Sequence, residues 1–477
     1  MNTTLLGGLM IGLLALGGCS DDGDDEASET DTSKAGGETT EEPAELTGLD
    51  TGFGQGGVLA SALSPTEHDR FLAVTPGADG SYYVAGFTET GEDHAMVLAK
   101  IGGDGALDQT FGQAGVATIN VAPGGKAVET ARAVVVQSDG KVVISGPIEK
   151  DPKATGLAAK DTDVALVRFD TTGKPDPTFG TEGVARLDFG RGKALPDESY
   201  LADNAWGLVT LPDNKLVLFG SSAVAGREDA DFTIAGLTSA GALDPAFGTK
   251  GILTVDQNKG ADTPRNMKLQ PDGKIVATGY SRDANDVVSP VLIRFSSDGK
   301  LDTSFGTGGV ATATVLPGGV AESYQFGLQG DNYVLGGYGH GADPEEKVDL
   351  ISYRFTATGT WDKTYGTDGL TRIDLAGLDD RARNLVVLPD GRVLGIGVGT
   401  PAEAASDAMV VLLDENGIPV PGFGTGGRVL SDLGGPADAW FGATLAEDGK
   451  SVMIVGYKGA DQAGTDNDNA AIARIKL

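Results

Sequence analysis

An aromatic residue followed by glycine recurs along the chain at intervals of about sixty residues. The intervals between successive copies are 58, 68, 68, 58, 60 and 58 residues. The aromatic residues are Phe53, Phe111, Phe179, Phe247, Phe305, Tyr365 and Phe423. A fixed period of this length predicts tandem structural units that pack against their neighbours. Residues 49–477 hold seven such units.

Each unit contains short apolar segments separated by turn residues. In the second unit, segments 131–137 and 141–146 flank Asp139-Gly140. This dipeptide is typical of a type I′ hairpin turn, in which both central residues have positive φ. Further strands are expected at 163–170 and 183–189. Four antiparallel strands, repeated seven times, predict an all-β fold: a seven-bladed β-propeller of four-stranded antiparallel blades.

The two ends of the repeat region are offset by one strand. The last unit ends at its third expected strand, residues 470–477, and a matching fourth strand stands at residues 57–63. We therefore expect the N-terminal strand to complete the last blade and close the ring. An open solenoid would instead need polar capping repeats at both ends, and the sequence shows none.

The first residues have the features of a targeting segment. Residues 5–17 form an apolar run of 13, which is too short to span a bilayer but is typical of a secretory signal peptide. The run leads into Leu16-Gly17-Gly18-Cys19, which resembles a bacterial lipobox. The resemblance implies a lipoprotein signal peptide at residues 1–18 and lipidation of Cys19. No aspartate follows the cysteine, so we expect an outer-membrane lipoprotein of the bacterial cell envelope, facing the periplasm or the surface.

Residues 19–48 are expected to form an acidic, disordered tether. Residues 20–48 contain 11 acidic residues, one lysine and no aromatic residue. Such a segment has no apolar surface to offset the entropy of ordering it, and its like charges extend it. The predicted organisation is therefore a signal peptide (1–18), a tether (19–48) and a propeller (49–477).

The repeated unit resembles the delta-60 repeat family of bacterial β-propeller proteins. The shared features are a hairpin, a strand ending in arginine and an aromatic residue, and the phrase Leu-Asp-x-x-Phe-Gly-x-x-Gly-Val. They are clearest at residues 164–169 with 176–184, and at residues 292–295 with 301–310. The family carries no established activity, so the resemblance implies the fold and leaves the function open.

Composition excludes several classes of function. The formal net charge of −32 argues against a nucleic-acid partner, because phosphate binding needs lysine and arginine. The single cysteine and three scattered histidines exclude internal disulfides and argue against a zinc centre. No catalytic residue is predicted, because motifs of the common hydrolases and nucleotide-binding sites are missing from the sequence.

One acidic position recurs ten residues before the hairpin aspartate, and it defines what we call the acidic column. The fifth unit has its acid one residue later. The column comprises Asp69, Glu129, Asp203, Asp262, Glu322, Asp380 and Asp438. A ring of these carboxylates would suit Ca²⁺, which takes six to eight oxygen ligands. Alternatively each acid caps local backbone N–H groups or pairs with Arg132, Arg265 or Arg383. The sequence leaves both interpretations open.

Two repeated features are interpreted as structural. The aromatic residue of each Phe-Gly phrase is expected in the core, and its glycine at positive φ. The strand-end arginines are expected to pair with the aspartate that stands three residues before the aromatic residue. These arginines are Arg168, Arg294, Arg354 and Arg474.

Two functions follow from these features. The first is a non-enzymatic, lipid-anchored binding or scaffold module, monomeric, with a protein, a glycan or a cation as its ligand. The alternative is a periplasmic or surface hydrolase that acts on a carbohydrate or a lactone through two carboxylates. The recurrence of the acidic column in nearly every unit favours the binding module.

Overall fold

The computed structural model describes most of the repeat region. It covers residues 50–477 except 51, 55–56, 62, 64–67, 126–127, 191, 197, 199, 344, 376, 403–404, 436 and 460–467. The predicted signal peptide, Cys19 and the tether lie outside the described residues. Within them, the one helical element is the short 3₁₀ helix Gly156–Lys160. A search of the same residues finds no helix with the length and apolar character needed to cross a membrane.

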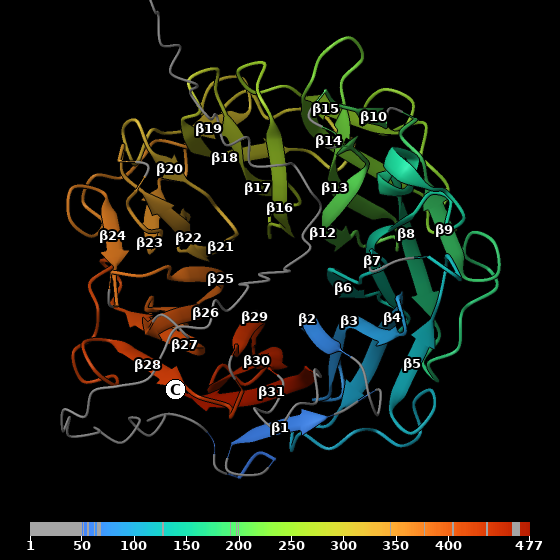
Figure 1. The fold of residues 1–477 in the computed structure, drawn as a ribbon, viewed down its shortest axis with the longest axis horizontal. Coiled ribbons are helices and arrows are strands. Elements are labelled where there is room, and N and C mark those ends of the chain that lie inside the picture. The colour runs from blue at the N-terminus through green and yellow to red at the C-terminus, as the bar shows by residue number, and fades with distance from the viewer. Residues whose placement is uncertain are drawn as a thin grey trace, which may run out of the picture.

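Antiparallel sheets are arranged around a common centre (Figure 1). Four of them have four strands that follow one another in the chain. They are β2 (Asp69–Pro76), β3 (Tyr82–Thr90), β4 (Asp93–Ile101) and β5 (Val116–Ile119); β6 (Ala133–Val136), β7 (Val142–Glu149), β8 (Thr162–Phe169) and β9 (Val184–Leu187); β12 (Asn204–Thr210), β13 (Leu216–Ala223), β14 (Ala230–Leu237) and β15 (Ile252–Val255); and β25 (Arg381–Val387), β26 (Val393–Ala402), β27 (Ala405–Leu413) and β28 (Arg428–Ser431). The all-β class and the four-stranded antiparallel sheets predicted from the sequence are confirmed.

One sheet has nine strands, where the sequence predicts two separate sheets. Its strands are β16 (Asp262–Leu269), β17 (Ile275–Arg282), β18 (Val288–Phe295), β19 (Val310–Thr312), β20 (Val320–Ala321), β21 (Gln325–Gln329), β22 (Asn332–His340), β23 (Asp349–Phe355) and β24 (Leu370–Ile373). The short strand β20 joins the two halves, because it pairs in parallel with β18 and antiparallel with β22. Beside the larger sheets, β10 (Lys193–Ala194) pairs with β11 (Tyr200–Leu201).

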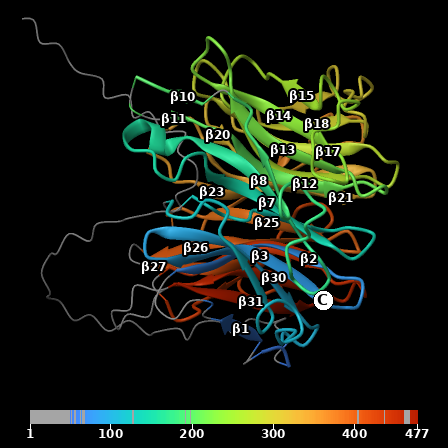
Figure 2. The same ribbon diagram turned by 90° about the vertical axis from the view of Figure 1, so that its right-hand side faces the viewer.

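The last sheet contains both ends of the described chain. It consists of β29 (Ala439–Leu445), β30 (Ser451–Lys458), β31 (Asn469–Lys476) and β1 (Val58–Ser61). Val58 pairs with Ala473, and β1 lies beside β31 in both ribbon views (Figures 1 and 2). Asp50 also forms an ion pair with Arg474. The predicted pairing of the N-terminal strand with the last unit is confirmed.

The first strand of each four-stranded set lies nearest the centre (Figure 1). These inner strands are β2, β6, β12, β16, β21, β25 and β29. Each of them contacts the next, and β29 contacts β2. The inner strands therefore surround the centre of the molecule, where their side chains can meet.

The Phe-Gly phrase packs the sheets together. Six of its seven aromatic side chains are at most 3% exposed, and all seven glycines have φ between 48° and 62°. Phe111, which follows β4, packs with Val134 of β6 and Ile144 of β7, in the next sheet. The structural interpretation of the phrase is confirmed.

The strand-end arginines join neighbouring units. Arg168 lies 2.9 Å from the carboxylate of Asp176 and donates a hydrogen bond of 2.6 Å to the carbonyl of Ser239 in the following unit. Arg294 and Arg354 make the equivalent ion pairs at 2.8 and 2.7 Å. The predicted arginine–aspartate pairs are therefore confirmed. We call this contact the arginine clasp.

The hairpin turn differs from the prediction. At Asp139-Gly140 the glycine has φ 81°, but the aspartate is not among the residues with positive φ. Gly140 donates to the carbonyl of Gln137, and Gln137 donates to the carbonyl of Lys141. This pattern is a type I turn followed by a glycine bulge, so the expected type I′ turn was wrong. The carboxylate of Asp139 accepts the Lys141 N–H instead, which explains the aspartate without positive φ.

Deleting residues 49–63 should strongly destabilise the fold. The deletion removes β1, the Asp50–Arg474 ion pair and the buried Phe53, whose burial alone is worth about 1.5–3 kcal/mol. It also leaves β31 as an unpaired edge. We expect the melting temperature (Tm) to fall by several degrees relative to a control lacking only residues 1–48. Equal values of Tm would contradict the importance of this pairing.

Candidate functional site

The acidic column lies at the start of the inner strands. Six of its seven members accept backbone N–H groups from the segment after the outermost strand of the preceding sheet. Glu129 accepts from Val121 and Ala122, at 2.7 and 2.9 Å. Asp203 accepts from Phe189 at 2.6 Å. These hydrogen bonds support the local-cap interpretation.

The seventh member behaves differently. Glu322 Oε2 lies 3.8 Å from Arg265 Nη2 and forms no hydrogen bond with the described residues. The fifth unit has Ala321 at the aligned position, so the carboxylate is displaced by one residue. Glu322 therefore faces the arginine of a neighbouring inner strand instead of capping a connection.

Burial makes several column members weak acids. It raises the pKa of Glu129 and Asp203 to about 7 and that of Asp262 to about 8. The backbone donors oppose this shift only in part. Burial also raises the pKa values of Asp380 and Asp438, to about 6.

Three column members lie beside other aspartates in groups close enough to share a cation. In each group, one carboxylate oxygen per residue lies within 4.8 Å of the others. The groups are Asp163, Asp188 and Asp203; Asp231, Asp256 and Asp262; and Asp349, Asp374 and Asp380. Each contains a single column member, so the described structure does not bring the column together into one ligand set.

Each of these groups already contacts a basic side chain. Lys150 Nζ lies 3.0 Å from Asp188, and Arg227 lies 2.6 Å from Asp256. Arg372 pairs with Asp349. A lysine or arginine side chain of the protein itself therefore neutralises part of the negative charge of each cluster. This further supports a structural role for these aspartates.

Replacing Asp262 should alter the pH dependence of stability. Because its pKa is raised to about 8, native Asp262 keeps a proton that the unfolded chain loses above about pH 4. Stability should fall as pH rises through this window, by at most about 1.4 kcal/mol per pH unit. We expect Asp262→Asn to match the wild type near pH 5 and to melt at a higher temperature near pH 8.5. Asp286→Asn, on an exposed carboxylate, is the matched control.

Asp262→Asn, together with Asp203→Asn, also tests the prediction that the acidic column binds Ca²⁺. Melting curves at pH 7.5 with and without millimolar Ca²⁺ should coincide if the acids are caps. A calcium-dependent rise in Tm that Asp203→Asn and Asp262→Asn abolish would instead assign the acids as ligands.

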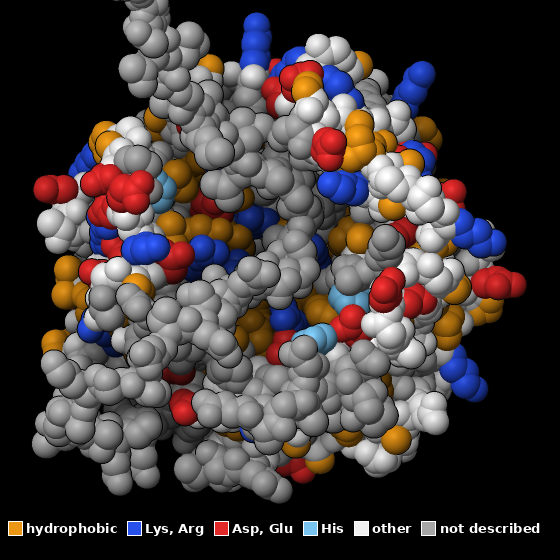
Figure 3. Space-filling model, viewed as in Figure 1, with side chains coloured by type: hydrophobic (Ala, Val, Ile, Leu, Met, Phe, Trp, Pro, Cys, Tyr) orange, Lys and Arg blue, Asp and Glu red, His pale blue; other side chains and the backbone are white. Residues whose placement is uncertain are grey.

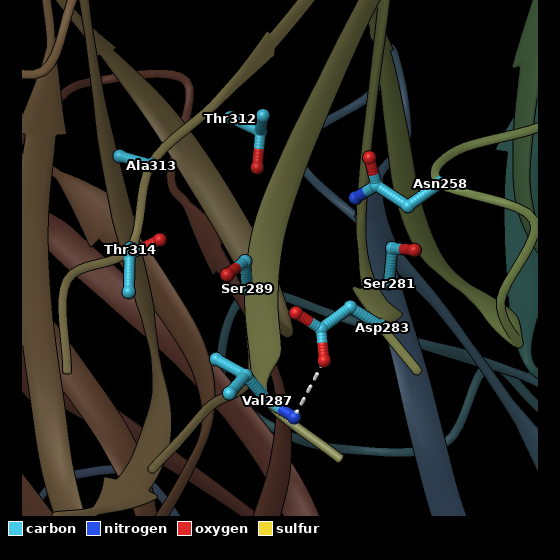
Figure 4. A pocket seen from close by; sticks show the side chains of 8 residues that line it. All are labelled: Asn258, Ser281, Asp283, Val287, Ser289, Thr312, Ala313 and Thr314. Carbon is cyan, nitrogen blue, oxygen red and sulfur yellow. Dashed lines mark hydrogen bonds between the residues drawn. The ribbon is translucent and has the colours of Figure 1, made fainter. Parts of the chain in front are cut away.

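A small polar pocket occupies the corresponding region of the fourth unit (Figure 4). It is lined by Asn258, Ser281, Asp283, Val287, Ser289, Thr312, Ala313 and Thr314. Ser289 and Thr314 stand where the second unit has Asp163 and Asp188, by their spacing from the repeated aspartate. Asp283 is satisfied by the Val287 N–H at 3.1 Å. The pocket is therefore lined by one carboxylate, whereas each aspartate cluster contains three.

A different set of side chains meets at the centre. Three residues after the aligned acidic position, most inner strands carry an extra residue at a β-bulge; in β16 it is Arg265, between Pro264 and Asn266. The residues at this position are Leu72, Arg132, Trp206, Arg265, Tyr324, Arg383 and Phe441. From Arg132 onwards, arginine alternates with an aromatic residue.

These side chains stack on one another from strand to strand. Two guanidinium groups lie over the Trp206 ring, that of Arg132 at 4.0 Å and that of Arg265 at 4.4 Å from the ring centroid. Arg265 also lies 4.1 Å from Tyr324, and Arg383 lies 5.3 Å from both Tyr324 and Phe441. We call these six residues, Arg132, Trp206, Arg265, Tyr324, Arg383 and Phe441, the arginine–aromatic arc. Figure 3 shows basic and hydrophobic side chains bordering the central hollow.

Hydrogen-bond donors predominate in the arc. Arg265 Nη2 donates to the hydroxyls of Tyr280 and Tyr324, both at 2.9 Å. Nε and Nη1 of Arg132 and Nε1 of Trp206 are buried and form no hydrogen bond with the described residues. Each buried donor without a partner costs about 1–3 kcal/mol. The arc therefore holds donors that its own described neighbours do not satisfy.

This arc was not predicted from the sequence. Arg132, Arg265 and Arg383 were expected only as partners of the acidic column, and the described residues include such an ion pair between Arg265 and Glu322. The signal was present in the sequence, three residues after each aligned acidic position. It was overlooked because the side chains at this position differ from unit to unit.

Comparison with known proteins supports the fold. Residues 137–179 and 270–305 match the model of a β-propeller family described as a domain of unknown function, DUF5122. This family is of the delta-60 repeat type, so the match supports the resemblance seen in the sequence. A search of curated proteins found no match.

Several solved structures show a distant likeness. Polysaccharide lyase Uly1 is 12% identical over 88% of this chain and 91% of its own, with a TM-score of 0.47. Sqt1 of Chaetomium thermophilum, bound to the N-terminus of ribosomal protein L10, is 11% identical over 87% and 99%, with a TM-score of 0.43. The GH93 α-L-arabinofuranosidase of Fusarium graminearum, bound to arabinobiose, is 12% identical over 88% and 98%, with a TM-score of 0.42. At these values the likeness does not resolve a function.

Proposed function

We propose that the protein is a non-enzymatic binding module built on a seven-bladed β-propeller. The seven inner strands and their mutual contacts support this blade count. In this proposal the nine-stranded sheet represents two blades joined by β20. The pairing of β1 with β31 supports closure of the last blade by the N-terminal strand.

The arginine–aromatic arc is the observation that carries the binding function. Core aromatics and glycines repeat from unit to unit, but the arc position alternates between arginine and aromatic residues. Packing of identical repeats does not require this variation. The buried donors on Arg132 and Trp206 that have no partner among the described residues fit a site arranged for a ligand.

The hydrolase alternative receives less support. Glycoside hydrolysis commonly uses two carboxylates on either side of the scissile bond. Glu322 contributes a carboxylate beside Arg265, whereas the side chains of the arc itself are arginines and aromatic residues. The arc is therefore better suited to holding a ligand than to general acid–base chemistry.

The envelope location is part of the same proposal. A lipid on Cys19 and an acidic tether over residues 19–48 would hold the propeller away from an outer membrane. Labelling with a fatty-acid analogue in a bacterial host should mark the wild type, and Cys19→Ser should abolish the label. A label that persists in the variant would contradict lipidation at this residue.

Removing the unpaired donors should not destabilise the fold. Arg132→Met keeps much of the side-chain volume and removes two buried donors without described partners. We expect Tm to stay equal to that of the wild type or to rise, as when binding residues are replaced. Arg168→Met, which breaks the arginine clasp, should lower Tm by several degrees and is the matched control. A comparable fall for Arg132→Met would make the arc a structural element and contradict the proposed function.

A further inference from the structure

The charge of Arg132 is not neutralised by the described structure. An arginine side chain stays protonated at physiological pH, and Arg132 forms no ion pair with any described residue. The acid three residues earlier, Glu129, directs both carboxylate oxygens to the backbone of Val121 and Ala122. A full positive charge therefore stands at the centre of a protein whose net charge is −32.

A second positive charge lies over the same indole ring. Arg132 and Arg265 are each within 4.4 Å of the Trp206 ring centroid. The indole attracts both guanidinium groups, but the two groups repel each other. Stacking on the ring leaves the edges of the guanidinium groups, where the N–H donors lie, for contact with a ligand.

Most polar groups along the arc are donors, although Glu322 contributes a carboxylate beside Arg265. Trp206 Nε1 can only donate, and it has no described acceptor. Tyr280 and Tyr338 remain protonated, because burial raises the pKa of each hydroxyl well above its usual value. The hydroxyls of Tyr338 and Tyr324 lie 3.1 Å apart. Such a set of donors suits a group that offers several acceptor oxygens and negative charge.

Resting on the proposed binding function, we infer that the edge formed by Arg132 and Trp206 is an oxyanion site. It binds a carboxylate, phosphate or sulfate group, which guanidinium groups recognise through parallel N–H···O hydrogen bonds. The bound group would satisfy the donors of Arg132 and Trp206 and reduce the repulsion between the two guanidinium groups. A cation would leave these donors unsatisfied, and a neutral ligand could accept their hydrogen bonds but would leave the charge uncompensated.

The test uses the full mature chain and four probes. Melting curves in a Tris–chloride buffer would be recorded with citrate, inorganic phosphate, sulfate or oligogalacturonate, each compared with sodium chloride at equal ionic strength. We expect at least one probe to raise Tm in a concentration-dependent way that sodium chloride does not reproduce. Citrate and oligogalacturonate distinguish a free carboxylate from the same group on a saccharide.

Calorimetric titration of the effective probe then assigns the site. Arg132→Met should weaken binding at least tenfold, while Arg392→Met, which removes an exposed turn arginine, should leave it unchanged. No probe-dependent rise, or equal affinity in Arg132→Met, would overturn the oxyanion assignment. If Arg132→Met retains its Tm but no oxyanion binds, only the ligand class fails. If Arg132→Met loses stability without ligand, the proposed function itself fails.

Discussion

The arginine clasp is the contact on which the order of the sheets depends. Each clasp joins a carboxylate in its own repeat to a backbone carbonyl in the next, as Arg168 does with Asp176 and Ser239. Beside it, the Gly180 N–H donates to the Ala240 carbonyl, again across two repeats. Each of the four clasp arginines donates to a backbone carbonyl of the next repeat, and Arg294 also donates to the Tyr333 hydroxyl. The backbone contact does not depend on the side chains of that turn, so these side chains can vary.

Because the clasps and the buried aromatic residues hold the sheets together, the bulged residues of the inner strands are less constrained by packing. The β-bulge places one residue of an inner strand outside the regular hydrogen-bond register, where it needs no match across the strand pair. The clasps and buried aromatics supply the stability, so this residue can be selected for chemistry. Arginine and aromatic side chains occupy that position in six consecutive units. Each guanidinium group then stacks on an aromatic ring from a neighbouring inner strand, and this contact fixes its orientation.

Much of the fold was predictable because the responsible residues recur at fixed spacing. The strands, the core aromatics, the arginine–aspartate pairs and the pairing of β1 follow from the period alone. The hairpin turn was predicted wrongly because Asp-Gly fits two turn types, and the Asp139 side-chain hydrogen bond decides between them. The arc was not predicted because no single residue type recurs at its position in every unit. The partners of the acidic column were also inaccessible, because Glu129 is satisfied by a connection from another sheet.

The pairing of β1 with β31 has a consequence for how the chain reaches its native state. Val58 of β1 pairs with Ala473 of β31, so the last sheet cannot be completed until nearly the whole polypeptide is present. Earlier repeats can assemble through contacts between neighbours, but the final step joins segments from the two extremes of the sequence. Contacts of such long range form slowly. During synthesis, β1 therefore stays unpaired with β31 until β31 has emerged.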